Sequence, residues 1–210
     1  MDTTHRTAID HVTLEVADAA SAEAFYAEAF GLGDTVRVRE ADAPTSGFRG
    51  FTLSLVVAQP STVDSLVGTA LDAGATVLKP VAKSFWGYGG VVRAPDGAIW
   101  KVASSAKKDS GPATREVDDV VLLLGVQDVR ASKQFYADHG LAVGKSFGSR
   151  YVELDTPGSA LRLALYTRRA AAKDAGVDPD GSGSHRLVVH GDVVGSLVDP
   201  DGFEWRASPR

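Results

Sequence analysis

The sequence predicts an α+β protein built from two related halves, and three observations carry this prediction. Strand-like alternation of apolar and polar residues is interspersed with helix-like stretches along the whole chain. A helix containing "FY" and a turn with the pattern "PDGxxW" each occur twice, in the same order. Between the two copies, residues 106–114 are polar, contain Gly and Pro, and show no periodicity, which is typical of a linker. We therefore expect domains at 1–105 and 117–210, joined by residues 106–116.

Composition and charge narrow the class of protein. The 210 residues are 44% apolar and 23% charged, which is ordinary for a chain that buries a core. A net charge of −5 argues against sequence-independent nucleic-acid binding, which needs a basic face. Cysteine is absent, which fits a reducing compartment, and the apolar run 120–126 is far shorter than the roughly 20 residues that span a bilayer. We expect a cytoplasmic protein that has a small-molecule ligand and neither a nucleic-acid nor a membrane partner.

The first half starts with a strand at 8–18, where apolar and polar residues alternate. A helix follows, for which Ser21 is the expected N-cap. Further strands are expected at 35–40 and 51–58, and apolar residues at three- and four-residue spacing predict a second helix at 61–75. Three short strands then close this half, with "PDG" as the tight turn before the last; they lie at 76–81, 89–94 and 98–104.

The second half restarts the same order of elements. A strand is expected within 117–128, a helix within 132–141, and then three short strands as far as residue 167. After that the halves differ, because residues 170–183 allow only a brief helical turn and 185–207 run from strand to strand. The first half is shortened in its middle and the second near its end.

A strand with "DHVTLEV", a helix with "FY" and "GL", and a closing "PDGxxW" turn resemble the glyoxalase/bleomycin-resistance/dioxygenase superfamily, also called vicinal oxygen chelate. The resemblance covers about 8–105 and 117–208 as two tandem copies. It implies βαβββ modules whose curved mixed or antiparallel sheets enclose a ligand-sized cavity. It implies no single activity, because members include metal-dependent lyases, isomerases and dioxygenases as well as metal-free drug-binding proteins. The sheet edges left exposed by trimmed copies make a homodimer one expected assembly.

The resemblance also allows a test for a metal. It implies that His11 stands at a first-strand ligand position, whereas the last-strand glutamate position holds Lys101 in the first copy and Arg206 in the second. A guanidinium does not coordinate metals at neutral pH, and an ammonium must first lose its proton. We therefore expect no metal cofactor. The alternative is a divalent Ni, Mn, Fe or Zn ion at a displaced site made by His11, His185 and Glu204.

Large planar side chains beside glycines predict a pocket for a flat ligand, with a cation available for an anionic or carbonyl group. The predicted ligand-binding residues are Phe51, Trp86, Tyr88, Lys101, Tyr166 and Arg206. The favoured function is metal-independent binding of a small aromatic or hydrophobic molecule, such as sequestration of an antibiotic, rather than catalysis. The alternative is a metal-dependent lyase, isomerase or dioxygenase. For an enzyme, with or without a metal, His11 and Glu15 are the catalytic candidates.

Overall fold

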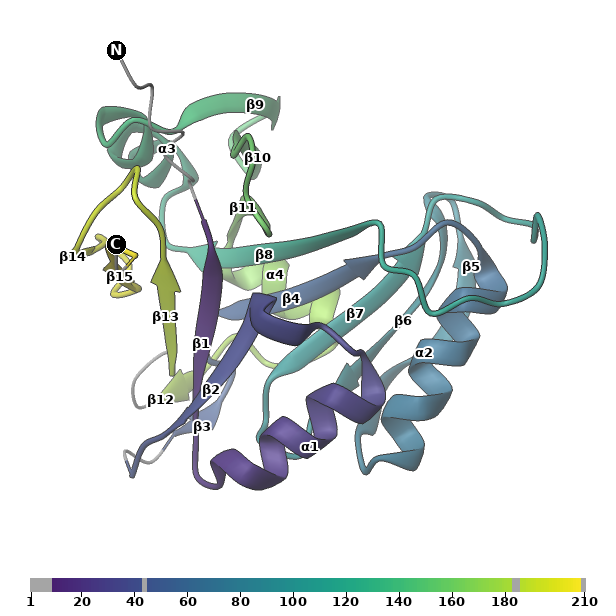
Figure 1. The fold of residues 1–210 in the computed structure, drawn as a ribbon. Helices are drawn as coiled ribbons and strands as arrows, with labels where there is room; N and C mark the ends of the chain where they lie inside the picture. The colour runs from purple at the N-terminus through teal and green to yellow at the C-terminus, as the bar shows by residue number, and fades with distance from the viewer. Residues whose placement is uncertain (1–8, 43–44, 183–185, 209–210) are drawn as a thin grey trace, which may run out of the picture.

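The computed structural model describes residues 9–42, 45–182 and 186–208, and its main elements are two mixed sheets (Figure 1). The eight-stranded sheet has, in spatial order, β5 (Thr76–Ser84), β6 (Gly87–Arg93), β7 (Ile99–Ser104), β4 (Phe51–Val56), β8 (Asp119–Val126), β11 (Arg162–Thr167), β10 (Tyr151–Asp155) and β9 (Ala142–Phe147). The five-stranded sheet has β14 (Leu197–Val198), β15 (Glu204–Arg206), β13 (Leu187–His190), β1 (His11–Val16) and β2 (Val36–Glu40). A two-stranded sheet pairs β12 (Gly181–Ser182) with β3 (Ser46–Gly47).

Four α-helices and one 3-10 helix connect these strands. They are α1 (Ala19–Ala29), the 3-10 helix Gly33–Thr35, α2 (Pro60–Asp72), α3 (Val129–Asp138) and α4 (Arg168–Ala175). The helices and most strands expected from periodicity are present. Two local details differ: the N-cap of α1 is Asp18, whose carboxylate accepts from the Ser21 amide at 2.9 Å, and the brief helical turn expected after residue 170 is the two-turn helix α4.

Two complete βαβββ units form the eight-stranded sheet. One runs β4-α2-β5-β6-β7 and the other β8-α3-β9-β10-β11, and in each the first strand lies parallel to the last. The five-stranded sheet contains two shorter units, β1-α1-β2 and β13-β14-β15, with the same parallel pairing of first and last strands. The first of these lacks a hairpin between helix and last strand, and the second has no helix among its described residues.

Each of the two large sheets contains strands from both halves of the sequence. β4 pairs antiparallel with β8, and β1 pairs antiparallel with β13. The expected linker lies between β7 and β8 and forms neither helix nor strand. It is packed against the first half, because Gln59 bonds to Ser110 and Pro112 and Arg115 donates to the Ala29 carbonyl at 2.8 Å. The domain division at 106–116 stays a prediction.

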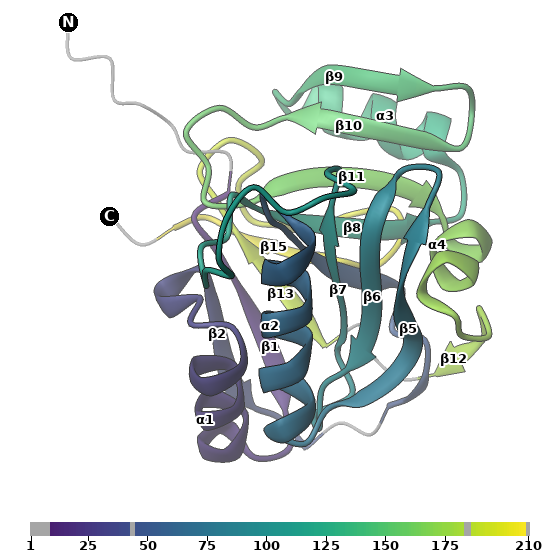
Figure 2. The same ribbon diagram turned by 90° about the vertical axis from the view of Figure 1, so that its right-hand side faces the viewer.

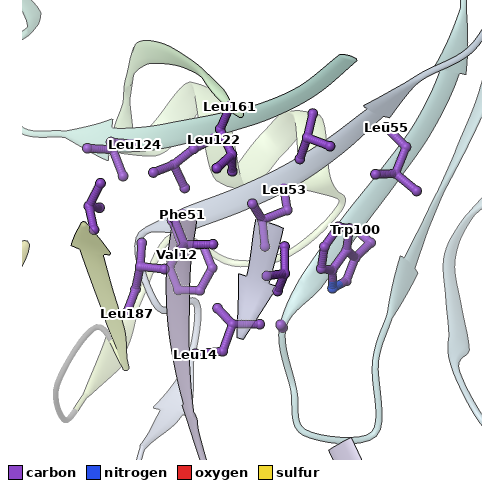
Figure 3. Close-up of a cluster of buried hydrophobic side chains, with 14 of the residues drawn as sticks. Val12, Leu14, Phe51, Leu53, Leu55, Trp100, Leu122, Leu124, Leu161 and Leu187 are labelled. Atoms are coloured by element: carbon purple, nitrogen blue, oxygen red, sulfur yellow. The ribbon is translucent and has the colours of Figure 1, made fainter. Parts of the chain in front are cut away.

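The core lies between the two sheets (Figure 3). Val12 and Leu14 of β1 face Leu53 of β4 and Leu122 of β8, and all four are fully buried. Burying a side chain of this size stabilises the fold by about 1.5–3 kcal/mol. Because β1 alternates, its other face carries polar side chains, and this places His11 on the surface of the sheet that is turned away from the core.

The two repeated motifs meet in the core, which explains their recurrence. Tyr136 of α3 donates its hydroxyl to Asp199 and accepts from the Trp205 indole at 3.2 Å. In the first half, Tyr26 of α1 donates to Asp96 of the "PDG" turn at 2.8 Å, and the Trp100 indole lies 3.5 Å from its hydroxyl. The tyrosine of each "FY" helix therefore contacts the tryptophan of a "PDGxxW" motif in the same half of the sequence.

Opposite faces of the eight-stranded sheet carry different helices. α2 packs on the core face, to which Val92 and Trp100 contribute, whereas α4 packs on the other face against Val91, Leu123 and Ala164. Figure 2 shows α2 and α4 on the two sides of strands β5, β6 and β7. No helix in the described part of the chain is long and apolar enough to cross a membrane.

Candidate functional site

A pocket of about 350 Å³ lies at the β5-β6-β7 end of the eight-stranded sheet, beside α4. Trp86, Tyr88 and Lys101, three of the residues predicted from the sequence, line it. Gly87 and Gly89 also line it, and a Cβ at either position would collide with a carbonyl of β7 or its end. The glycines therefore allow close packing of the strands under the pocket. Its volume is within the usual range for small-molecule sites.

Trp86 is the most exposed large apolar residue of this pocket. Phe85 and Trp86 form the two-residue turn between β5 and β6. Phe85 is 82% exposed and Trp86 is 84% exposed. Such turns normally hold Asn, Asp or Gly, so two aromatic rings at this place have no local structural reason. Their centroids are 5.0 Å apart in an edge-to-face arrangement. Only Trp86 of the two lines the pocket.

The charge at the pocket is mainly positive. Lys79 and Lys83 of β5 and Lys101 of β7 line it, and Asp174 of α4 is the one acidic group among its lining residues. Lys101 Nζ lies 2.9 Å from Asp174 Oδ2. A pocket lined by an exposed indole and by Lys101 can hold a flat molecule that carries an anionic or carbonyl group.

A second polar site lies on the outer face of the five-stranded sheet. The antiparallel pairing of β1 and β13 places His11 opposite His190, and their rings stack with centroids 4.1 Å apart and an interplanar angle of 11°. Thr13 Oγ1 lies 3.1 Å from His190 Nε2. His11 is 7% exposed, so this imidazole is largely removed from water.

The histidine pair is held in its neutral form. Burial, and after it the charges of His190 and Arg37, lower the pKa of His11 from its usual 6.5 to about 4. Burial also lowers the pKa of His190, followed by the positive charges of Arg206 and Arg37. Both rings are therefore uncharged at neutral pH, and each keeps a nitrogen lone pair available for hydrogen bonding or metal coordination.

The carboxylates of the same face are already paired with arginines. Glu15 accepts from Arg39, and Glu204 Oε1 accepts from Arg206 Nε at 2.6 Å. Within residues 9–42, 45–182 and 186–208, no three His, Asp or Glu side chains gather closely enough to hold a metal ion. His185, the other predicted ligand, lies outside the described residues. The described donor set is two imidazoles without a free carboxylate, and it does not fit the three protein ligands of a catalytic metal centre.

The structure separates the remaining sequence-predicted residues. Phe51 is 2% exposed in the core, and Tyr166 is half-buried beside α4, edge-on to Tyr151. The Tyr88 hydroxyl is turned toward α2, where it donates to Asp64 at 2.9 Å. Arg206 lies on the five-stranded sheet, away from Lys101. The predicted ligand-binding set thus spans two sites and the core.

Sequence reasoning missed His190, Lys79 and Asp174. His190 is the last residue of the alternating stretch "LVVH", and the alternation does indicate that it shares a face with Val188. Thr13 of its partner strand is 177 positions away in the sequence, and no local pattern identifies that pairing. Lys79 and Asp174 meet only because α4 packs on the sheet face that carries Lys101.

A larger hollow of about 480 Å³ lies where β1 enters α1. Two arginines that line it hold the surrounding loops: the buried Arg186 donates to the carbonyls of Glu15 and Ala41, both at 3.0 Å, and the partly buried Arg49 donates to the carbonyl of Asp96. Bonds to backbone carbonyls fix loop geometry, so we assign these two side chains a structural role.

Comparison with solved structures identifies the fold. The chain is similar to glyoxalase I from Zea mays, with a TM-score of 0.62 at 13% identity over 96% of this chain and 92% of that chain. It is also similar to a putative dioxygenase from Bacillus subtilis, with a TM-score of 0.56 at 12% identity over 88% of this chain and 70% of that chain. No family model and no curated protein sequence matches the chain. The predicted α+β fold of βαβββ units is confirmed, while the tandem two-copy organisation stays a prediction.

Proposed function

We propose that this chain, which has the fold of glyoxalase I, binds a small aromatic or hydrophobic molecule without a metal, in the pocket lined by Trp86 and Lys101. The observation that carries the proposal is an indole 84% exposed beside a pocket of about 350 Å³. Leaving an indole in water has no benefit for folding, whereas a ligand that stacks on it removes apolar area from water. An antibiotic or another aromatic metabolite has the required shape, and sequestration is the simplest activity of such a site.

The test uses two probes with the same ring system and different charge, the anion 2-naphthoate and the neutral 2-naphthamide. Isothermal titration calorimetry of the wild-type protein should show binding that is unchanged by EDTA. Trp86→Ser should weaken binding of both probes by about fivefold to tenfold, because stacking contributes about 1 kcal/mol. Phe85→Ser is the matched control, since it removes an equally exposed ring that does not line the pocket.

Two results would contradict the proposal. Equal binding by Trp86→Ser and Phe85→Ser would place the probes elsewhere. Binding that EDTA abolishes and an added divalent ion restores would make a metal necessary.

A second candidate function is a metal-dependent lyase, isomerase or dioxygenase on the five-stranded sheet. The observation in its favour is the pair of neutral, stacked imidazoles of His11 and His190. Against it, Glu15 and Glu204 are held by arginines. Elemental analysis of protein purified without chelator decides the matter: one Ni, Mn, Fe or Zn per chain, lost in both His11→Ala and His190→Ala, would support this function over the first.

A further inference from the structure

The helix beside the pocket, α4, is too short to be stable when alone, and some of its charges oppose the helix dipole. Arg168 and Arg169 stand in its first turn, where the helix dipole is positive. In its last turn, where the dipole is negative, Asp174 is unfavourable and only Lys173 is favourable. The Thr167 side chain makes no capping hydrogen bond. A helix of eight residues is also too short to be stable in isolation. The helical state of this segment therefore depends on contacts with the rest of the protein.

Those contacts are of three kinds. At the N-terminal end, Arg168 donates to the carbonyls of Pro179 and Phe48 at 3.0 and 2.7 Å. Along its length, α4 buries only small side chains, Ala171, Ala172 and Ala175, against the sheet. Gly125 of β8 leaves the room for this approach, since a Cβ there would lie 3.2 Å from the Arg168 Cα. Small side chains bury little apolar area, so packing alone holds the helix weakly.

At its C-terminal end, α4 is held by two lysines of the pocket. Lys79 Nζ donates to the carbonyls of Lys173 and Asp174 at 2.8 and 2.6 Å, which places a cation at the negative end of the helix dipole. Lys101 Nζ pairs with Asp174 Oδ2 at 2.9 Å. We call Lys79, Lys101 and Asp174 the latch.

The latch forms part of the pocket wall. All three of its side chains line the pocket, and those of Lys101 and Asp174 are 38% and 44% exposed. An arriving anionic group can therefore reach the Lys101 ammonium. An ion pair exposed to this extent contributes little net stability. A ligand anion that also stacks on Trp86 can therefore displace Asp174 from Lys101.

We propose that the ligand of this pocket is an anion, and that its negative group replaces Asp174 at Lys101 and so loosens the C-terminal turn of α4. This inference rests on the proposed function and adds to it a ligand charge and a movement. The inference predicts that substitutions of the two partners of this ion pair have opposite effects on binding of the anion. Lys101→Met removes the partner of the ligand anion, whereas Asp174→Asn removes the competitor.

Calorimetry with 2-naphthoate and 2-naphthamide measures both effects. The wild type should bind 2-naphthoate about fivefold to tenfold more tightly than 2-naphthamide, as a charge-assisted contact implies, and Lys101→Met should abolish that preference. Asp174→Asn should tighten 2-naphthoate binding by about twofold to fivefold and leave 2-naphthamide binding unchanged. Lys145→Met and Asp155→Asn are the controls, since both change the same charges at exposed positions on β9 and β10.

Hydrogen exchange reports the movement separately from affinity. Saturating 2-naphthoate should speed amide exchange in residues 171–176, while saturating 2-naphthamide should not. Equal affinity for the two probes, or weaker 2-naphthoate binding by Asp174→Asn, would overturn the inference and leave the proposed function standing if Trp86→Ser still weakens binding. Slower exchange in α4 with bound 2-naphthoate would also overturn it. If neither probe binds, the proposed function fails and this inference fails with it.

Discussion

The buried hydroxyl of Tyr136 offers a sharp test of how the repeated motifs stabilise the fold. Tyr136 is fully buried, donates to Asp199 Oδ2 at 2.5 Å and accepts from the Trp205 indole nitrogen at 3.2 Å. Tyr136→Phe keeps the ring and removes the hydroxyl. Both the carboxylate oxygen and the indole nitrogen then lose this partner. At about 1–3 kcal/mol for each buried polar group left unsatisfied, the two groups together should lower the free energy of unfolding by about 2–6 kcal/mol.

Two further tyrosine–aspartate pairs calibrate this value. Tyr26 is 4% exposed and bonds to Asp96 at 2.8 Å, but its indole partner is 3.5 Å away, so Tyr26→Phe should cost about 1–2 kcal/mol. The hydroxyl of Tyr88 bonds to Asp64 at the surface, where water replaces the lost partner, so Tyr88→Phe should cost less than about 0.5 kcal/mol.

The cost of Tyr136→Phe should also depend on pH. Burial raises the pKa of Asp199 above its usual value of 3.8, and the Tyr136 hydroxyl opposes that rise. Removing the hydroxyl raises the pKa further, so the folded variant binds a proton more readily than the unfolded chain does. Its stability is then lower above the raised pKa and recovers as the pH falls toward 3.8.

Urea denaturation of the three variants at about pH 7.5 and about pH 4.5 measures both effects. The expected order of destabilisation is Tyr136→Phe, then Tyr26→Phe, then Tyr88→Phe, with the first cost smaller at the acidic pH. Equal costs for the three variants would refute the reasoning, because they would show that burial does not set the value of these hydrogen bonds.

Three other predictions follow from the described contacts. The pKa of His11 in the folded protein is about 4, below the usual value of 6.5, so the unfolded state binds this proton more readily and the free energy of unfolding falls as the pH drops from 6.5 toward 4. His11→Gln should flatten that slope in urea titrations, and an unchanged slope would contradict this. Trp86 is exposed while Trp100 and Trp205 are 0% and 1% exposed, so Trp86→Phe should remove most of the emission that acrylamide quenches. Gly125→Ala should lower the free energy of unfolding by about 1–3 kcal/mol, since the new Cβ would lie 2.8 Å from the Gly50 carbonyl; a stability equal to wild type would show that α4 and the loop can move aside.

Local patterns predicted the elements well, because hydrophobic alternation and helical spacing are properties of short segments. The turn "PDG" does lead into the last strand of its unit at Ile99, and the strand beginning at Phe51 starts where the alternation begins. The N-cap of α1 was assigned three residues too late, since Asp18 and Ser21 are both good capping residues and only the backbone geometry distinguishes them.

The candidate site was predicted only in part, because a pocket is made by residues distant in sequence. Trp86, Tyr88 and the glycines within residues 85–90 line the pocket, and Lys101 joins them through the pairing of β6 with β7; that they bind a ligand stays a prediction. The direction of each ring was not predictable, since Tyr88 turns toward Asp64 while Trp86 stays in solvent. Nothing in the local sequence indicates that His190 stacks on His11, because strand partners are chosen by the whole fold.

The pairing of β1 with β13 has a consequence for how the chain is made. Thr13 and His190 are in contact although they lie 177 positions apart, so β1 has no antiparallel partner until β13 has been synthesised. At cellular translation rates this delay is on the order of 10 seconds. Contacts of such long range also slow folding after release from the ribosome. Until β13 is available, the apolar face of β1 must be covered by the "FY" helix that follows it or by a chaperone. Substitutions that weaken α1 should therefore reduce the yield of native protein more than they reduce its final stability.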